Sequence, residues 1–97
     1  MIFVDTWAWV ALADRSDPYH QKAKAQHNKL QRARRRYVTS DFVLGETITY
    51  LFDALPFAQA EAFIGAVLLA TDQGSTQLLH ISAAQVSTGL GTAATIP

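Results

Sequence analysis

Short apolar runs alternate with longer amphipathic segments along this chain. The run at 2–4 ends at Asp5, and uninterrupted β-favouring runs of this length are typical of buried strands. Runs at 37–40 and 77–82 predict two further strands. Between the strands, the spacing of apolar side chains predicts four helices, at about 6–12, 18–35, 41–55 and 57–74. The order strand, two helices, strand, two helices, strand predicts an α/β fold with a short parallel sheet flanked by helices.

Polar residues and glycine indicate where the helices begin and end. Thr6 can cap the first helix, and Asp17 followed by Pro18 is typical of a helix start. Gly74 ends the fourth helix. Ser82 can cap a further helix that begins at "AAQV".

The last segment, "STGLGTAATIP", does not continue this pattern. It has no large apolar face, carries two glycines and ends in proline, so a helix should not propagate through it. We therefore predict an incomplete domain at 1–86 and an irregular tail at 87–97. The C-terminal helix and strand that such a domain would need are predicted to be missing.

Composition narrows the class of protein. Of the 97 residues, 49% are hydrophobic and none is cysteine, so a compact fold without disulfides or thiolate metal ligands is expected. No run approaches the roughly 18 apolar residues that a membrane span needs, and the N-terminus lacks the features of a signal peptide. We expect a cytoplasmic protein with no membrane partner.

Charge is distributed unevenly although the net charge is zero. All eight Lys and Arg lie between Arg15 and Arg36, whereas the rest of the chain after Arg36 holds five acids and no base. The asymmetry suggests a basic surface for an anionic partner beside an acidic region.

Asp5 and Glu46 are the pair with the clearest chemical potential. Asp5 ends the first strand, and Glu46 lies in the second turn of the helix after the second strand. If those strands are neighbours, both carboxylates can project into one cleft and hold Mg²⁺ or Mn²⁺. The alternative is that Asp5 only caps a helix and Glu46 is only a solvated helix residue.

Two longer stretches, "MIFVDTWAWVALADRSDPYHQKA" and "YVTSDFVLGETITYLFD", resemble the PIN-domain family and specifically the VapC-like toxins of toxin–antitoxin systems. The resemblance spans about 1–86. It implies a three-layer α/β fold and a metal-dependent endoribonuclease that is inhibited by an antitoxin protein and is commonly a homodimer.

The resemblance also implies roles for single residues. Asp5 and Glu46 match the family's first two acidic metal ligands, and Thr6 and Ser40 match positions that support the site. The remaining acids of the family come later, but this chain has no Asp or Glu after Asp72. Roughly half of the acidic site is therefore absent, which leaves activity open.

A cluster of arginines adjoins the second strand. An RNA-backbone contact is one interpretation, because arginine binds phosphate in a forked geometry. A solvated helix end, favoured by the helix dipole, is the other. The cluster consists of Arg32, Arg34, Arg35 and Arg36.

The remaining aromatic and imidazole side chains are predicted to be structural or superficial. His20 and His27 are two helical turns apart, too far to chelate one ion, and are expected on the surface or in contact with a partner. His80 is expected inside the third strand. Trp7 and Trp9 are expected in the core, with base stacking as the alternative.

Three hypotheses follow from these observations, and the third is a general RNA-binding module that uses the arginine cluster alone. The first is a Mg²⁺- or Mn²⁺-dependent ribonuclease of the VapC type. The second is a catalytically inactive PIN-like protein that acts by binding an antitoxin-like partner or a second copy of itself.

Overall fold

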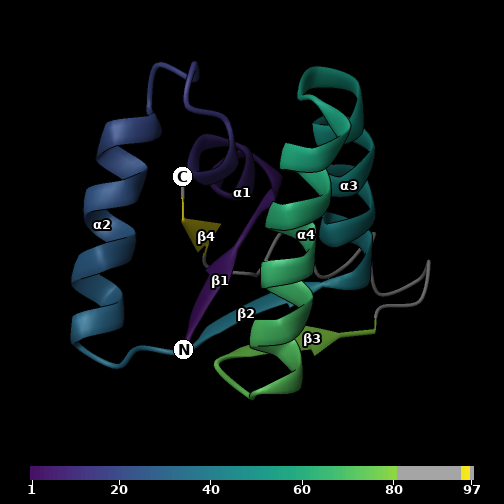
Figure 1. Ribbon diagram of the computed structural model, residues 1–97. Helices are drawn as coiled ribbons and strands as arrows, with labels where there is room; N and C mark the ends of the chain where they lie inside the picture. The colour runs from purple at the N-terminus through teal and green to yellow at the C-terminus, as the bar shows by residue number, and fades with distance from the viewer. Residues whose placement is uncertain (81–94, 97) are drawn as a thin grey trace.

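The computed structural model describes residues 1–80 and 95–96 (Figure 1). Its elements are β1 (Ile2–Val4), α1 (Thr6–Ala13), α2 (His20–Arg32), β2 (Tyr37–Ser40), α3 (Asp41–Ala54), α4 (Phe57–Asp72), β3 (Thr76–Leu79) and β4 (Thr95–Ile96). The first seven elements follow the predicted order. None of the helices in the described residues is both long and apolar enough to cross a membrane.

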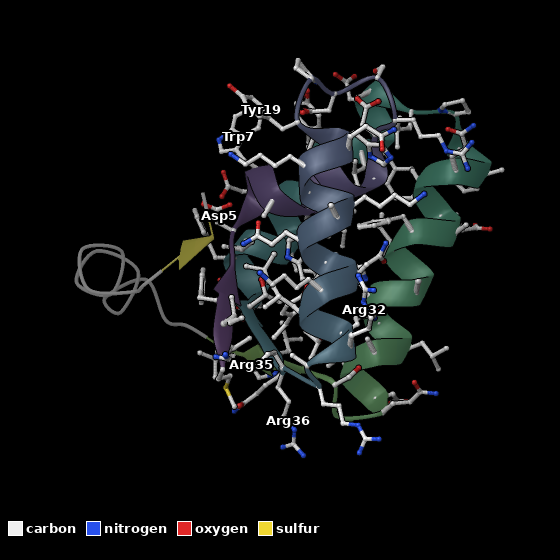
Figure 2. All side chains as sticks on the ribbon, turned by 90° about the vertical axis from the view of Figure 1, so that its left-hand side faces the viewer. Asp5, Trp7, Tyr19, Arg32, Arg35 and Arg36 are labelled. Atoms are coloured by element: carbon white, nitrogen blue, oxygen red, sulfur yellow. The ribbon has the colours of Figure 1, made fainter. Side chains whose placement is uncertain are left out.

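The sheet has the strand order β3-β2-β1-β4, and every neighbouring pair is parallel. The α/β class and the parallel sheet are thus confirmed, and the described helices lie to one side of the strands in Figure 2. The fourth strand differs from the prediction of an irregular tail, because Thr95 and Ile96 pair with Phe3 and Val4. Both tail residues are β-branched, which suits them to a strand. The helix predicted after Ser82 lies outside the described residues, as does the rest of the tail.

Two helix starts differ from the sequence prediction. The cap of α1 is Asp5 and not Thr6, because Asp5 is extended (φ −92°, ψ 178°) and its carboxylate accepts the backbone N–H of Ala8. Helix α2 begins at His20, two residues later than expected. Asp17 instead forms a turn, in which its carboxylate accepts the backbone N–H of Tyr19 at 2.8 Å.

The main core cluster lies between the helices and the sheet, and Trp9 is central to it. Its side chain is 4% exposed, and its indole nitrogen donates to the Thr39 hydroxyl, which in turn donates to the carbonyl of Val4. The Trp9 ring meets Tyr37 and Phe63 edge to face. This arrangement joins α1 to β1, β2 and α4.

Trp7 is not a core residue, contrary to the prediction. It is 64% exposed and touches the ring of Tyr50 at its edge. Residues two apart on a helix point to different sides, so only one of the two tryptophans of α1 can face the sheet.

A second core cluster joins α1 to α3 and α4. Its members are Val10, Leu51, Ala60 and Ile64. Val10 and Leu51 are fully buried. This packing holds α1 against α3 and α4.

Two histidines were expected on the surface, and this is wrong for His20. It is buried, with Nδ1 2.7 Å from the carbonyl oxygen of Ala11, because the first turn of α2 folds back onto α1. His27 is half-buried, with Nδ1 2.9 Å from the Tyr37 hydroxyl. Burial lowers the pKa of His27 and raises that of Tyr37.

Candidate metal centre

The carboxyl ends of the parallel strands bring polar residues from distant parts of the sequence to one edge of the sheet. We call this the carboxyl edge and define it by Asp5, Thr6, Ser40, Asp41, Glu46 and His80. In open parallel sheets, ligands bind outside the carboxyl ends of the strands. The edge is therefore the first place to look for a site.

Asp5 follows β1 and serves as the N-cap of α1. Its Oδ1 accepts the backbone N–H of Ala8 at 3.2 Å, and its side chain is half-buried. The prediction that Asp5 caps a helix is thus confirmed. A carboxylate offers two oxygens and about four lone-pair sites, so one capping bond is compatible with holding a cation as well.

Glu46 reaches the end of β1 from α3. The Thr6 hydroxyl donates to Glu46 Oε1 at 3.5 Å, although the two residues lie 40 positions apart. Because Thr6 follows Asp5 directly, this contact places the Glu46 carboxylate beside the first turn of α1. The contact between Thr6 and Glu46 agrees with the prediction that Asp5 and Glu46 lie at the same edge of the sheet.

The donor set fits a hard divalent cation. Two carboxylates supply oxygen ligands of the type that Mg²⁺ and Mn²⁺ prefer, and such ions keep several waters. Among residues 1–80 and 95–96 no group of three or more His, Cys, Asp or Glu side chains could hold a metal ion. Within the described residues, a metal site made by Asp5 and Glu46 therefore stays a prediction, and these two carboxylates would supply only part of a coordination shell.

Ser40 lies at the same edge but acts on the helix. Its hydroxyl accepts the backbone N–H of Val43 at 3.1 Å, and the side chain is only 2% exposed. It therefore caps α3, the helix that carries Glu46.

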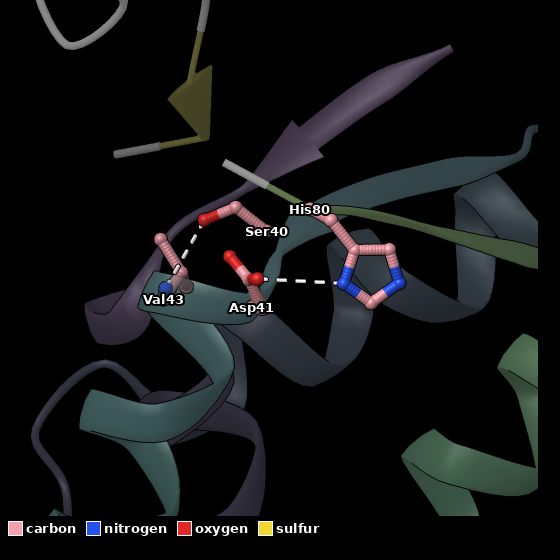
Figure 3. A network of polar contacts seen from close by, with 4 residues as sticks. All are labelled: Ser40, Asp41, Val43 and His80. Carbon is pink, nitrogen blue, oxygen red and sulfur yellow. Dashed lines mark hydrogen bonds and ion pairs between the residues drawn. The ribbon is translucent and has the colours of Figure 1, made fainter. Parts of the chain in front are cut away.

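The sequence interpretation missed the pair formed by Asp41 and His80. The Asp41 carboxylate lies 3.4 Å from His80 Nδ1 (Figure 3). Strand β3 ends at Leu79, earlier than predicted, so His80 follows the strand instead of lying within it. Both residues come directly after a strand, and that position was the signal that could have identified them.

The arginine cluster lies at the opposite edge. Arg35 and Arg36 precede β2, and Figure 2 shows them near the bottom of the view, below Asp5. Four residues of strand span roughly 13 Å. The cluster and the candidate metal ligands are therefore not brought together in one site.

Part of the arginine cluster borders a groove of about 1000 Å³ between α2 and α4. Its floor includes Trp9, Tyr37 and Phe63, which are aromatic. The charged residues that line it are all basic: Arg15, Lys24, Arg34, Arg35 and Arg36. This groove combines an apolar floor with a cationic rim.

Comparison with known proteins adds independent support for the fold. The sequence matches no family model and no curated protein. Its structure is similar to the crystal structure of VapC20 from Mycobacterium tuberculosis, a toxin that cleaves the sarcin–ricin loop, with a TM-score of 0.70 and 30% identity. The resemblance to VapC-like PIN-domain proteins is confirmed. The match covers 94% of this chain and 65% of VapC20.

Proposed function

We propose that this chain is a metal-dependent endoribonuclease of the VapC type. The observation that carries the proposal is the contact from Thr6 to Glu46, which brings a second carboxylate to Asp5 at a strand end of a VapC-like fold. Asp5 and Glu46 would hold Mg²⁺ or Mn²⁺. Thr6 orients Glu46, and Ser40 fixes the start of α3.

A bound divalent ion would supply charge neutralisation on a phosphate group and would make a water molecule a better nucleophile. The protein contributes the rest through position. The α1 cap holds Asp5 at the end of β1, and the packing of Val10 on Leu51 keeps α1 and α3 together.

RNA is the substrate class that we propose. VapC20 cleaves the sarcin–ricin loop, so a hairpin of that type is a suitable first substrate beside a mixed single-stranded pool. The arginines of the opposite edge would contact phosphates away from the cleavage position. The cytoplasm, where such RNA occurs, is the proposed location.

Cleavage of these RNAs with Mg²⁺, with Mn²⁺ and with a chelator tests the proposal. Asp5→Asn should reduce the cleavage rate by about 100-fold or more, because a metal ligand contributes several kcal/mol to the transition state. Asn is as good an N-cap as Asp, so the variant should fold normally. Asp53→Asn, at an exposed position of α3, is the matched control and should retain activity.

Equal cleavage by the parent chain and by Asp5→Asn would contradict the proposal. Cleavage that the chelator leaves unchanged would also contradict it.

A second candidate function is binding without catalysis. The groove between α2 and α4 favours it, since an apolar floor and a basic rim suit an acidic amphipathic helix such as that of an antitoxin. A folded chain that binds such a partner but cleaves no RNA would support this candidate.

A homodimer is also proposed. Exposed apolar side chains on α3 and α4 give a surface that a second copy could cover: Phe52, Phe57, Leu68 and Leu69. Sedimentation analysis of the parent chain and of Phe57→Ser would test it, with dissociation expected for the variant.

A further inference from the structure

Trp7 is an exposed aromatic side chain that the proposed metal site does not use. It lies in the first turn of α1, two residues after Asp5, and it is 64% exposed. A single exposed ring of this kind would need no explanation. Trp7 is not single, however, because its ring contacts Tyr50 and because it shares a groove with the exposed ring of Tyr19.

The contact between Trp7 and Tyr50 lies beside the contact between Thr6 and Glu46. The ring centroids of Trp7 and Tyr50 are 5.8 Å apart, and the ring planes meet at 70°. Tyr50 follows Glu46 by four residues, so the two side chains lie on the same face of α3, about 6 Å apart along the helix axis. On α1, Thr6 contacts Glu46 and the next residue contacts Tyr50. The aromatic pair is therefore continuous with the candidate metal centre.

Trp7 also lines a groove of about 560 Å³ between α1 and α2. This volume is within the roughly 300–1,000 Å³ that is usual for sites of small organic ligands. Tyr19, the residue before α2, lines the same groove from the other helix and is 68% exposed. Figure 2 shows Trp7 and Tyr19 above Asp5. The walls between them are apolar and include Ala8, Ala11, Leu12, Ala23 and Leu30.

The groove between α1 and α2 is nearly neutral. Its charged side chains are Asp17 and Lys22, one of each sign. His27 also lines it, and burial lowers the pKa of this imidazole, which favours the uncharged form at neutral pH. The groove between α2 and α4, in contrast, has a basic rim.

This difference in charge identifies the kind of occupant. A neutral groove does not attract an acidic helix or a cluster of phosphates, whereas a nucleobase is flat, aromatic and uncharged. The exposed amide of Gln26 lines the groove and can both donate to and accept from the edge of a base.

We propose that Trp7 stacks on an unpaired base of the RNA, next to the phosphate that is cleaved. This inference rests on the proposed ribonuclease function and names the part of the substrate that the site recognises. With the phosphate held at Asp5 and Glu46, the base of an adjoining nucleotide enters the groove beside Trp7. Tyr50 is a positioning residue in this scheme, since it acts through Trp7. Because stacking tolerates every base, the site should require an unpaired base more than a particular one.

The experiment is a binding scan with the full chain and RNA hairpins of the sarcin–ricin type. Each hairpin lacks one base of the loop, which is replaced by an abasic sugar, and the intact hairpin is the reference. Affinity is measured by fluorescence anisotropy in the presence of a chelator, so that metal-dependent cleavage does not interfere. The proteins are the parent chain, Trp7→Ala, Trp7→Phe and, as the control at an exposed position of α3, Asp53→Asn. Mapping of the product ends with Mg²⁺ or Mn²⁺ separately identifies the bases that flank the cleaved phosphate.

Trp7→Ala should bind the intact hairpin about tenfold more weakly, which is within the range for a lost stack between a base and an aromatic ring. The parent chain should lose a similar factor when one particular base is removed, and Trp7→Ala should lose no further affinity for that RNA. That base should flank the cleaved phosphate. Trp7→Phe keeps an aromatic ring and should retain most of the affinity, and Asp53→Asn should bind like the parent. Thermal unfolding should show that Trp7→Ala is folded, because the side chain is exposed and alanine favours a helix.

Three results would overturn the inference. Unchanged RNA affinity in Trp7→Ala would exclude a stack, and a simultaneous change in sedimentation would assign the ring to a second copy of the chain. If the losses from Trp7→Ala and from every abasic position simply multiply, no base of the loop meets this ring. A matching base far from the cleaved phosphate would separate Trp7 from the reaction site.

Failure of the proposed function is distinguishable from these results. If the parent chain cleaves no RNA although the scan finds a matching base, the proposed function is wrong, and with it the placement of the base beside a cleaved phosphate. The stacking of that base on Trp7 would still be supported.

Discussion

The two edges of the sheet differ in charge and in the helix ends that they meet. At the carboxyl edge, α1 and α3 begin, and they are capped by Asp5 and Ser40. At the other edge, α2 ends with Lys29 and Arg32 in its last turn, and arginines continue to the start of β2. Helix dipoles favour acids at the first kind of end and bases at the second. The basic and acidic parts of the sequence thus lie at opposite edges of the sheet.

The comparison raises the question of whether a structural and a functional role coincide in one residue. Asp5 caps α1 and is also the proposed metal ligand. The dipole at the C-terminal end of α2 accounts for the position of the arginines, and some of them also border a groove. Variants that separate the two roles are therefore the informative ones.

The largest effect is expected on the free energy of unfolding, when the packing behind the carboxyl edge is loosened. Leu51→Ala removes a fully buried side chain that packs with Val10, and it should lower the free energy of unfolding by about 2–5 kcal/mol. Leu68→Ala is the control, because Leu68 is 48% exposed on α4 and should cost much less. Urea denaturation measures both. A loss below about 1 kcal/mol for Leu51→Ala would show that this cluster does not hold the edge together.

An intermediate effect is expected on RNA affinity, from variants at the opposite edge. The double variant Arg35→Ala/Arg36→Ala should bind RNA about tenfold more weakly and with a shallower dependence on salt, because phosphate contacts release counterions. Asp5→Asn should not reduce the salt dependence. Lys29→Ala, an exposed cation outside the groove lining, is the control. Fluorescence anisotropy at several salt concentrations gives the comparison. Unchanged RNA affinity in the double variant would contradict an RNA contact and leave the solvated helix end or a groove partner as the role of these arginines.

The smallest effect concerns the dependence of stability on pH. Burial lowers the pKa of His27 below its ordinary 6.5, so the unfolded chain binds a proton more readily than the folded one. Stability should therefore be unaffected by His27 well above pH 6.5 and should fall as the pH drops below it. Thermal unfolding between pH 8 and pH 5 measures this, and His27→Gln should flatten the decline. An equally steep decline in the variant would assign the pH dependence to other groups.

Much of the fold could be predicted from the hydrophobic pattern, because short apolar runs and amphipathic segments have different periods. The shared edge of Asp5 and Glu46 followed from strand order. The pair of Asp41 and His80 did not, since it depends on β3 ending at Leu79, and a period-two pattern does not define that end. The exposed side of Trp7 was missed for a related reason, because a fully apolar helix does not reveal which face is buried.

The separation of the arginines from Asp5 was not predicted, although the direction of the strands implies it. Both adjoin strands in the sequence, but Arg36 precedes β2 whereas Asp5 follows β1. In a parallel sheet, residues before and after strands lie at opposite edges. Applying that rule to the arginines would have separated the two sites.

The most direct test of the account is the affinity for Mn²⁺, measured by the loss of the free-ion electron paramagnetic resonance signal. The parent chain should bind Mn²⁺, and both Asp5→Asn and Glu46→Gln should weaken binding by about tenfold or more, the range seen when a metal site loses a supporting group. Glu61→Gln, an exposed glutamate of α4, should bind like the parent. If Asp5→Asn and Glu46→Gln bind Mn²⁺ as tightly as the parent chain, the carboxyl edge is not the metal centre.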